Sequence, residues 1–444
     1  MGSDGLRRRQ QSGGLAVTGL LAVGVCVATL DRAVATLPYD TSGALLVAPA
    51  LIAVTVPWLL RIAHRDGDAW LGRVLVAAFL LKLVASVVRY YVAFEVYEGV
   101  ADAVAYDVRA AELAPVLRGG SFDLDLGFPI PGTGFPVLLT TMVYALIGPT
   151  RLGAFLMFAW LAFIGAVLFV RAFRLALPDG DRRRYTLAVL LLPSLLFWPA
   201  SIGKESWLML VLGVATYGTA RIFARRRGGY LIVALGLCGL ALVRPHVSVL
   251  VAVALTVGYL RRRAARTSRP GLAAQVVGLT LLLLGGMVLV RQTQRFFGVE
   301  ELSVAAATDV FEDTRDRTAA GGSEFEASPV RSPLDLPAGL VTVLFRPFPH
   351  EAHNAQALLA SLEGLVLLAL FATSARRLRG LPRLAWRDPY VAFAVSFVLM
   401  FAVAFSNFGN FGLLVRQRVQ VLPLALILMA LPLRASATLR TAAP

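Results

Sequence analysis

The recurrence of long apolar runs from one end of the chain to the other constrains its fold most. Twelve runs approach the length of about 20 residues that a helix needs to cross a hydrocarbon core about 30 Å thick. They are Gly14–Leu30, Ala44–Leu60, Leu71–Phe94, Leu152–Val170, Tyr185–Ile202, Trp207–Ile222, Tyr230–Val243, Val247–Leu260, Ala273–Val290, Ala357–Ala372, Tyr390–Phe405 and Val419–Leu431. Hydrophobic residues make up 57% of the 444 residues and charged residues 16%, against about 25% charged in a soluble domain. The sequence therefore predicts an all-α polytopic membrane protein, a single transmembrane domain over residues 1–444 with about twelve spans.

A thirteenth apolar run, Phe135–Ile147, is about two-thirds as long as a full span. We expect it to form an interfacial or re-entrant helix. With a cytoplasmic N-terminus, this choice places the arginine clusters in cytoplasmic loops, as the positive-inside rule requires. Two long loops, residues 95–151 and 291–354, then lie outside. The net charge of +16 is thus explained by membrane orientation, and we expect no nucleic-acid partner.

Unusual polar residues gather at the outer turns of this topology. Polar groups at a membrane face commonly mark a site. Arginine forks bind phosphate oxygens in pairs, and a lysine offers a compact point charge, so these turns predict a site for a lipid phosphate. Alternatively, Lys204 and Glu205 form a pair that snorkels to the interface. The substrate-binding candidates here are Lys204, Glu205, Arg244, His246, Arg346, His350, Arg416 and Arg418.

The first outer loop opens with a predicted helix over Ala101–Leu117, which stops at Gly119-Gly120. Helical spacing places Asp102, Tyr106 and Arg109 on one face, whereas Asp107 points elsewhere. Asp102 and Asp107 are the candidate catalytic carboxylates. N-capping is the rival role for Asp102, and simple solvation is the rival for Asp107.

Cofactor signals are weak in this sequence. Cys26 and Cys238 both lie inside apolar runs, so neither a disulfide framework nor a cysteine metal motif is available. His350 and His353 could share a zinc ion, but no third ligand is apparent and pairing with Glu351 competes. We therefore predict no cofactor; the sequence leaves a divalent metal possible but does not indicate one, and we assign no metal ligands.

The first outer loop resembles that of the GT-C superfamily, which includes lipid-dependent protein mannosyltransferases and aminoarabinose transferases. The resemblance covers about Glu95 to Arg184 and rests on Asp102, Tyr106, Gly119, Pro136, Ile147-Gly148 and Arg151. It implies that Asp102, with Asp107 second, is the catalytic base or holds the acceptor. It adds Tyr106, Arg109 and Arg151 to the substrate-binding candidates.

The resemblance implies an enzyme of a bacterial cell membrane with an extracytoplasmic active site. It would transfer a sugar from a polyprenyl-phosphate donor to a glycan, lipid or protein acceptor. The chain also resembles Wzy-type polysaccharide polymerases, which use outer arginines to handle a diphosphate-linked lipid. A transporter or flippase for lipid-linked saccharides is the third possibility. Against it, no half-length repeat is found, and only Lys82 and Arg89 look deep within a span.

Overall fold

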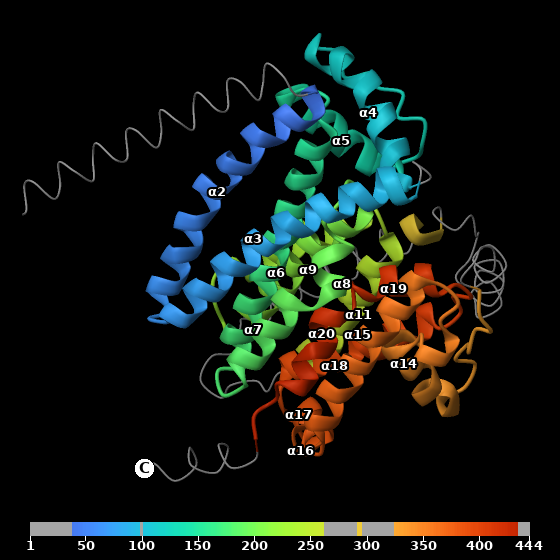
Figure 1. Ribbon diagram of the computed structural model, residues 1–444. Coiled ribbons are helices and arrows are strands. Elements are labelled where there is room, and N and C mark those ends of the chain that lie inside the picture. Colours follow the sequence, from blue (N-terminus) through green and yellow to red (C-terminus); the bar gives the residue numbers. More distant parts are fainter. Residues whose placement is uncertain (1–37, 98–100, 262–290, 295–323, 434–444) are drawn as a thin grey trace, which may run out of the picture.

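The computed structural model describes residues 38–97, 101–261, 291–294 and 324–433 (Figure 1). Within these residues the chain is helical, and no strand forms beyond an isolated bridge between Glu324 and Asn410. The first part comprises α2 (Tyr39–Arg65), α3 (Ala69–Tyr91), the π-helix η1 (Val92–Val96), α4 (Asp102–Arg118), α5 (Gly134–Ile147), α6 (Arg151–Ala176), α7 (Arg182–Leu191), α8 (Pro193–Phe197), α9 (Lys204–Phe223), α10 (Gly229–Ala241) and α11 (Pro245–Leu260). The second part comprises η2 (Pro333–Asp335), α14 (Leu336–Phe345), η3 (Pro349–Glu351), α15 (Ala355–Thr373), α16 (Ala375–Leu378), α17 (Leu381–Arg387), α18 (Pro389–Phe405), α19 (Phe411–Arg418) and α20 (Leu422–Met429). The predicted all-α class is confirmed for the described residues.

Several helices have the length and composition of membrane spans. Five described helices qualify singly: α2, α3 together with η1, α6, α9 and α15. Two bent pairs raise the number to as many as seven, namely α17 with α18, bent by 115°, and α19 with α20, bent by 66°. This pattern is consistent with a polytopic membrane protein. It falls short of twelve spans, and two of the predicted runs, Gly14–Leu30 and Ala273–Val290, lie outside the described residues.

Prolines and short helices explain part of the difference. The run Tyr185–Ile202 is divided between α7 and α8, because Leu192 is extended (ψ 129°) before Pro193. A proline disfavours the helical conformation in the residue before it and has no N–H to continue the ladder. Helices α10 and α11 hold 13 and 16 residues, and α20 holds only 8. Each of these is shorter than a full span of about 20 residues.

Polar contacts define the two ends of the bundle. At one end Asp40, near the start of α2, accepts hydrogen bonds from Tyr90 Oη on α3 and from Leu152 N on α6. At the opposite end Arg174 of α6 pairs with Asp66 and Asp68 in the turn between α2 and α3. Helices α2 and α6 therefore run in the same direction, and α3 runs in the opposite direction and packs against both. Because α4 lies at the first end (Figure 1), we call this the α4 end.

The segment between α3 and α6 leaves and re-enters the bundle at the α4 end. The α5 helix, which contains Phe135–Ile147, packs along α4. Its last residue, Ile147, accepts a hydrogen bond from Tyr39 Oη at the start of α2. Thr150, which precedes α6, donates to the Asp40 carbonyl and accepts a hydrogen bond from Gly153 N as a helix cap. The chain between α3 and α6 thus begins and ends at the same end of the bundle, as expected if α5 does not cross the membrane.

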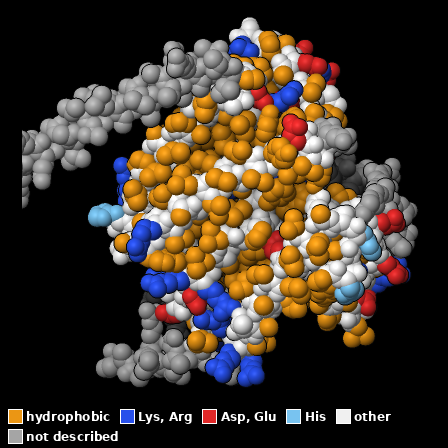
Figure 2. Space-filling view, in the orientation of Figure 1, with side chains coloured by type: hydrophobic (Ala, Val, Ile, Leu, Met, Phe, Trp, Pro, Cys, Tyr) orange, Lys and Arg blue, Asp and Glu red, His pale blue; other side chains and the backbone are white. Residues whose placement is uncertain are grey.

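Charged side chains are distributed unevenly over the face seen in Figure 2. Basic side chains, which are arginines, gather toward the bottom of the view; acidic side chains appear at the top and right, and a broad apolar surface lies between. The basic end holds Arg61 and Arg65 of α2 and Arg183 of α7. A broad apolar band between polar ends is typical of a surface that contacts lipid.

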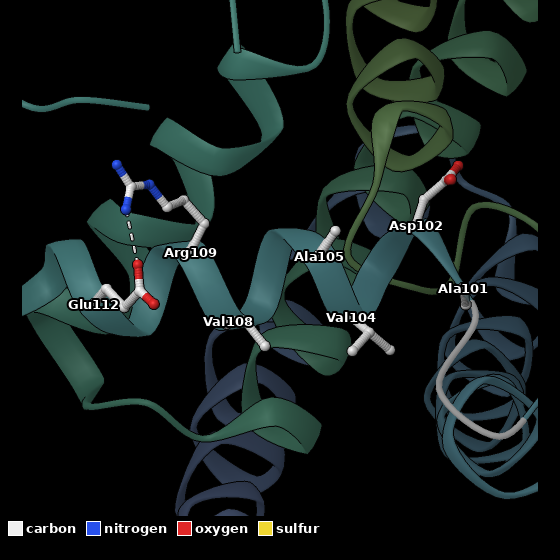
Figure 3. A pocket seen from close by; sticks show the side chains of 7 residues that line it. All are labelled: Ala101, Asp102, Val104, Ala105, Val108, Arg109 and Glu112. Carbon is white, nitrogen blue, oxygen red and sulfur yellow. Dashed lines mark hydrogen bonds and ion pairs between the residues drawn. The ribbon is translucent and has the colours of Figure 1, made fainter. Parts of the chain in front are cut away.

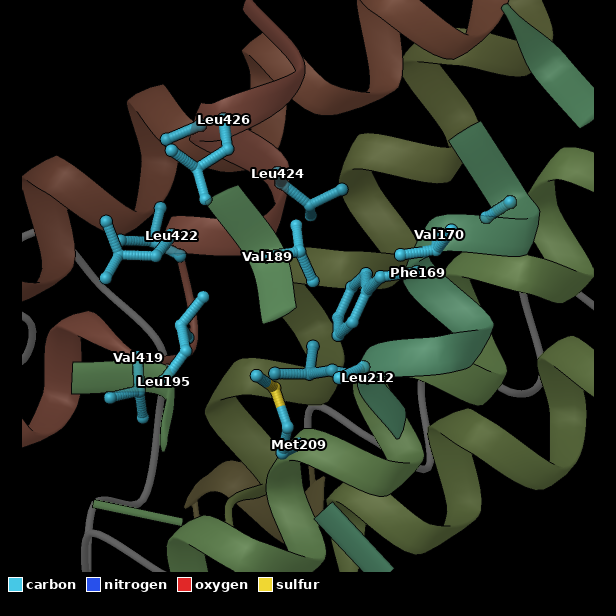
Figure 4. Close-up of a cluster of buried hydrophobic side chains, with 14 of the residues drawn as sticks. Phe169, Val170, Val189, Leu195, Met209, Leu212, Val419, Leu422, Leu424 and Leu426 are labelled. Atoms are coloured by element: carbon cyan, nitrogen blue, oxygen red, sulfur yellow. The ribbon is translucent and has the colours of Figure 1, made fainter. Parts of the chain in front are cut away.

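The core is centred on α6 and α9, which pack against each other and connect to α18 and α20 through α7 and α11. Figure 4 shows side chains from α6, α7, α9 and α20 meeting there, including Phe169, Val189, Met209 and Leu424. Gly165 and Gly213 allow the close approach of α6 and α9. A Cβ atom on Gly165 would lie 2.2 Å from the carbonyl oxygen of Met209. Small residues at such crossings are characteristic of membrane helix pairs, and this crossing fixes α9, whose first residues enter the candidate site.

Candidate functional site

Arg416 of α19 joins two carboxylates that come from distant parts of the chain. Its Nη1 lies 2.6 Å from Oδ2 of Asp102, the first residue of α4. On its other edge, Nε lies 2.8 Å from Oε1 of Glu205, and Nη2 donates to Oε2 at 3.0 Å. Glu205 lies in the first turn of α9, and its side chain is only 4% exposed. The contact of Nη2 with Oε2 is a charge-assisted hydrogen bond, and that of Nε with Oε1 is an ion pair at short distance.

A second arginine reaches the same buried carboxylate from the turn between α10 and α11. Arg244 is the residue that precedes α11, and its Nη2 lies 3.8 Å from Oε1 of Glu205. Its Nη1 donates to Oε1 of Gln417. Gln417 follows Arg416 on α19. Helix α19 therefore carries one arginine of the site, Arg416, and binds the other, Arg244, through Gln417. We call Asp102, Lys204, Glu205, Arg244, Arg416 and Gln417 the Arg416 cluster.

Lys204 completes the positive charge of this cluster. Its Nζ donates to the hydroxyl of Thr133 at 2.9 Å, a neutral partner that precedes α5. It interacts electrostatically with Arg244, Arg416, Glu205 and Asp102. Because this hydroxyl is neutral, the hydrogen bond does not neutralise the ammonium charge, which can attract a further anion.

Tyr106 lies one turn along α4 from Asp102 and is 3% exposed. Burial, together with the negative charges of Asp102 and Glu205, raises the pKa of its phenol above the ordinary value. Tyr106 therefore stays neutral and can act only as a hydrogen-bonding or packing group beside the cluster.

An open hollow of about 570 Å³ lies along α4 (Figure 3). Asp102 stands at one end of it and the Arg109–Glu112 pair at the other. The Asp102 side chain remains 55% exposed although Arg416 holds one of its oxygens. Arg109 pairs with Glu112 at 2.8 Å and with Asp125 at 2.9 Å. The hollow thus leads from solvent to the carboxylate at the edge of the cluster.

Asp107, the second candidate carboxylate, has a different environment. Its side chain is 4% exposed. One oxygen accepts from Tyr144 Oη of α5 at 2.5 Å and the other from Arg151 Nε of α6 at 2.7 Å. Burial and this carboxylate raise the pKa of Tyr144. Because both oxygens are engaged, Asp107 and Arg151 fasten α4 to α5 and α6 and give no sign of contacting a substrate.

The remaining predicted residues form separate groups. Arg346 pairs with Glu351 at 2.6 Å and lies over the ring of Phe325. Arg418 is fully buried and donates to the carbonyls of Val343 and Arg346, which satisfies the C-terminal end of α14. The structure therefore brings Lys204, Arg244 and Arg416 together, and gives Arg346 and Arg418 partners outside this cluster.

The two candidate histidines, His350 and His246, pack against aromatic rings. His350 is exposed and stacks on Phe348 with ring centroids 5.9 Å apart. His246 is in the first turn of α11, with its ring 6.2 Å from that of Phe405. No group of three or more metal-ligating side chains occurs among the described residues.

Sequence reasoning missed three participants. Gln417 could have been found from its position between Arg416 and Arg418. Thr133 carries no signal beyond its place in a glycine-rich stretch. Arg89 was noted only as a deep charge of the third span, yet it interacts electrostatically with Arg416, Glu205 and Asp102.

Comparison of the chain with protein-family models, with curated proteins and with solved structures finds no match.

Proposed function

We propose that this protein is a GT-C-like membrane glycosyltransferase. It would transfer a sugar from a polyprenyl-phosphate donor to a glycan, lipid or protein acceptor. The observation that carries the proposal is the junction of Asp102 with Arg416, Arg244 and Lys204 around Glu205, beside an open hollow. An accessible carboxylate next to concentrated positive charge suits deprotonation of a hydroxyl near a leaving phosphate.

The chemistry assigns a role to each side of the junction. Asp102 accepts the proton of the acceptor hydroxyl, whose oxygen attacks the anomeric carbon of the donor sugar. The bond from that carbon to the lipid phosphate oxygen breaks, and the configuration inverts. Arg244, Arg416 and Lys204 stabilise the negative charge that accumulates on the departing phosphate. No metal is required by this scheme.

Arg416 connects the two roles through its present partners. Its three nitrogens are occupied by Asp102 and Glu205. An arriving phosphate competes best with Asp102, because that carboxylate is 55% exposed whereas Glu205 is 4% exposed. Displacement of Asp102 from Arg416 frees it to act as base when the donor is bound. Buried Glu205 keeps Arg416 in place throughout.

The finer topology is part of the same proposal. We propose about twelve spans in a bacterial cell membrane, with the α4 end extracytoplasmic and the arginine-rich end cytoplasmic. The distribution of arginines supports this orientation. The cluster lies at one end of the bundle, which favours an enzyme over a transporter, since transporters bind substrate near the bilayer midplane.

Reconstituted protein tests the proposal. The full chain in proteoliposomes would receive polyprenyl-phosphate donors that carry different radiolabelled sugars, with a crude envelope extract as acceptor. We expect label to move to the acceptor for at least one donor. Transfer only from diphosphate-linked oligosaccharides would support the polymerase alternative. Movement of labelled lipid between leaflets without any transfer would contradict the enzyme and support a flippase.

A further inference from the structure

Arg89 is a buried cation with unused hydrogen-bonding capacity. It lies near the end of α3 and is 7% exposed. Its Nε and Nη1 atoms are buried and donate no hydrogen bond within the part of the chain that the structure describes. A buried guanidinium without partners is costly, and each such group in a native protein calls for an explanation.

Aromatic rings surround this guanidinium. Its Cζ atom lies 5.0 Å from the ring centroid of Phe197, 5.1 Å from that of Trp198 and 5.9 Å from that of Tyr97. The ring faces attract the positive charge. They do not accept the hydrogen bonds that the N–H groups donate in the plane of the guanidinium. Tyr97 is itself fixed, because its hydroxyl donates to Gln356 of α15 at 2.6 Å. The rings therefore stabilise the positive charge of Arg89 but leave its Nε–H and Nη1–H groups without a hydrogen-bond acceptor in the described residues.

Charge in the neighbourhood favours an anion as the missing partner. Arg89 interacts electrostatically with Asp102, Glu205 and Arg416. The interacting cations are Arg89, Lys204, Arg244 and Arg416, and the interacting carboxylates are Asp102 and Glu205. Four positive and two negative charges leave a net charge of +2. Both carboxylates already bind Arg416. A phosphate group carries enough negative charge to neutralise this excess positive charge.

We propose that Arg89 is a further binding residue of this site, whose buried fork binds the oxygens of a phosphate group carried by a polyprenyl lipid. The proposal rests on the proposed function for the identity of the lipid. In this proposal the aromatic rings of Phe197, Trp198 and Tyr97 have a second role, since they offer apolar surface next to the phosphate on which a lipid chain would pack. Arg89 contributes from α3, opposite the cations of α9, α11 and α19.

The matched pair of variants is Arg89→Met and Lys82→Met in the full chain, reconstituted in nanodiscs. Lys82 is also a buried cation of α3, but its Nζ donates to the carbonyls of Leu195 and Leu196 at 3.0 and 2.8 Å. A structural cation of that kind stabilises the fold, and its loss should lower the melting temperature. Replacement of an unpaired buried charge by an apolar side chain should leave the melting temperature unchanged or raise it.

Binding of undecaprenyl phosphate provides the functional readout. We expect Arg89→Met to weaken binding by at least about tenfold, the effect of losing hydrogen bonds to a charged group, and Lys82→Met to bind within about twofold of the unchanged protein. Undecaprenol, which has no phosphate, should not bind detectably. Inorganic phosphate that displaced undecaprenyl phosphate at similar concentrations would show that Arg89 binds phosphate. The ligand would then be free phosphate and not a lipid headgroup.

Three results would overturn the assignment. They are unchanged binding in Arg89→Met, equal binding of undecaprenol and its phosphate, and destabilisation or misfolding of Arg89→Met like that of Lys82→Met. The last would mean that the aromatic contacts give Arg89 a structural role. A different outcome is that no sugar is transferred although lipid binding still depends on Arg89. That result would contradict the proposed function but would support the assignment of Arg89.

Discussion

Arg416 binds Asp102 and Glu205 through opposite edges of one guanidinium, at 2.6 Å and 2.8 Å. These carboxylates are separated by about a hundred residues in the sequence and begin helices α4 and α9. One partner is exposed at the hollow and the other is buried. This asymmetry lets one arginine both anchor the site and release a carboxylate.

Arg416→Lys should damage the fold and the site together. A lysine has a single point charge and cannot contact two carboxylates through a rigid fork. We expect a loss of about 1–3 kcal/mol in the free energy of unfolding, the range for hydrogen bonds to charged groups. The control is Arg109→Lys, whose partners Glu112 and Asp125 are exposed, so its cost should be under about 1 kcal/mol. Equal melting temperatures for the two variants would show that the Arg416 fork contributes little.

Asp107→Asn should destabilise the protein more than Asp102→Asn does. An asparagine at 107 can still accept from Tyr144 but loses the ion pair with Arg151. We expect a cost of about 1–3 kcal/mol, against under about 1 kcal/mol at the exposed Asp102. Thermal unfolding in detergent measures both. The reverse order of melting temperatures would contradict the anchoring role of Asp107.

Glu351 should make part of the stability dependent on pH. Burial alone would raise its pKa, but the hydrogen bonds and charge of Arg346 outweigh burial and hold the pKa of Glu351 below its ordinary value. A carboxyl with a lowered folded pKa contributes stability above its unfolded pKa of about 4.3 and loses it as the pH falls through the folded pKa.

The matching variant is Glu351→Gln. Its melting temperature should lie below that of the unchanged protein at pH 7, and the difference should shrink as the pH falls below about 4. A difference that stays constant from pH 7 to pH 3 would show that the ion pair with Arg346 does not contribute.

Gly165→Ala should disturb the site from a distance. The new Cβ would meet the Met209 carbonyl at 2.2 Å, a backbone atom that cannot swing away. We expect a cost of about 1–3 kcal/mol, as for other overpacked cores, and a shift of α9 that displaces Lys204 and Glu205. Gly380→Ala is the control, because its nearest neighbours lie at 3.4 Å and 4.0 Å. Unchanged melting temperature and lipid binding in Gly165→Ala would mean that the crossing has room to adjust.

Local features of the sequence were predictable and long-range partners were not. The helix predicted over Ala101–Leu117 is confirmed as α4, because its composition and the glycines that end it act locally. The rival role of Asp102 as an N-cap is wrong, since Ala101 is the capping residue. Nothing in the sequence near Asp107 identifies Tyr144 and Arg151 as its partners, because only the packing of α5 and α6 brings them there.

The different environments of Arg416 and Arg418 also depend on packing that the sequence does not show. Arg416 and Arg418 are two residues apart and carry identical chemistry, so sequence reasoning predicts the same role for both. A helix turns by about 200° over two residues, which directs Arg416 to the cluster and Arg418 into the core beneath α14. The described helices include fewer full-length spans than the apolar runs predict for a similar reason, since an apolar run does not show that a helix is interrupted at Pro193 or that α20 stops after 8 residues.

Sugar transfer by Asp102→Asn tests the central claim most directly. Asparagine preserves the size of the side chain and can still accept from Arg416, but it cannot take a proton from an acceptor hydroxyl. The account predicts normal insertion, a melting temperature close to that of the unchanged protein, retained binding of undecaprenyl phosphate, and transfer slower by at least about 100-fold. Full transfer activity in this variant would contradict the account.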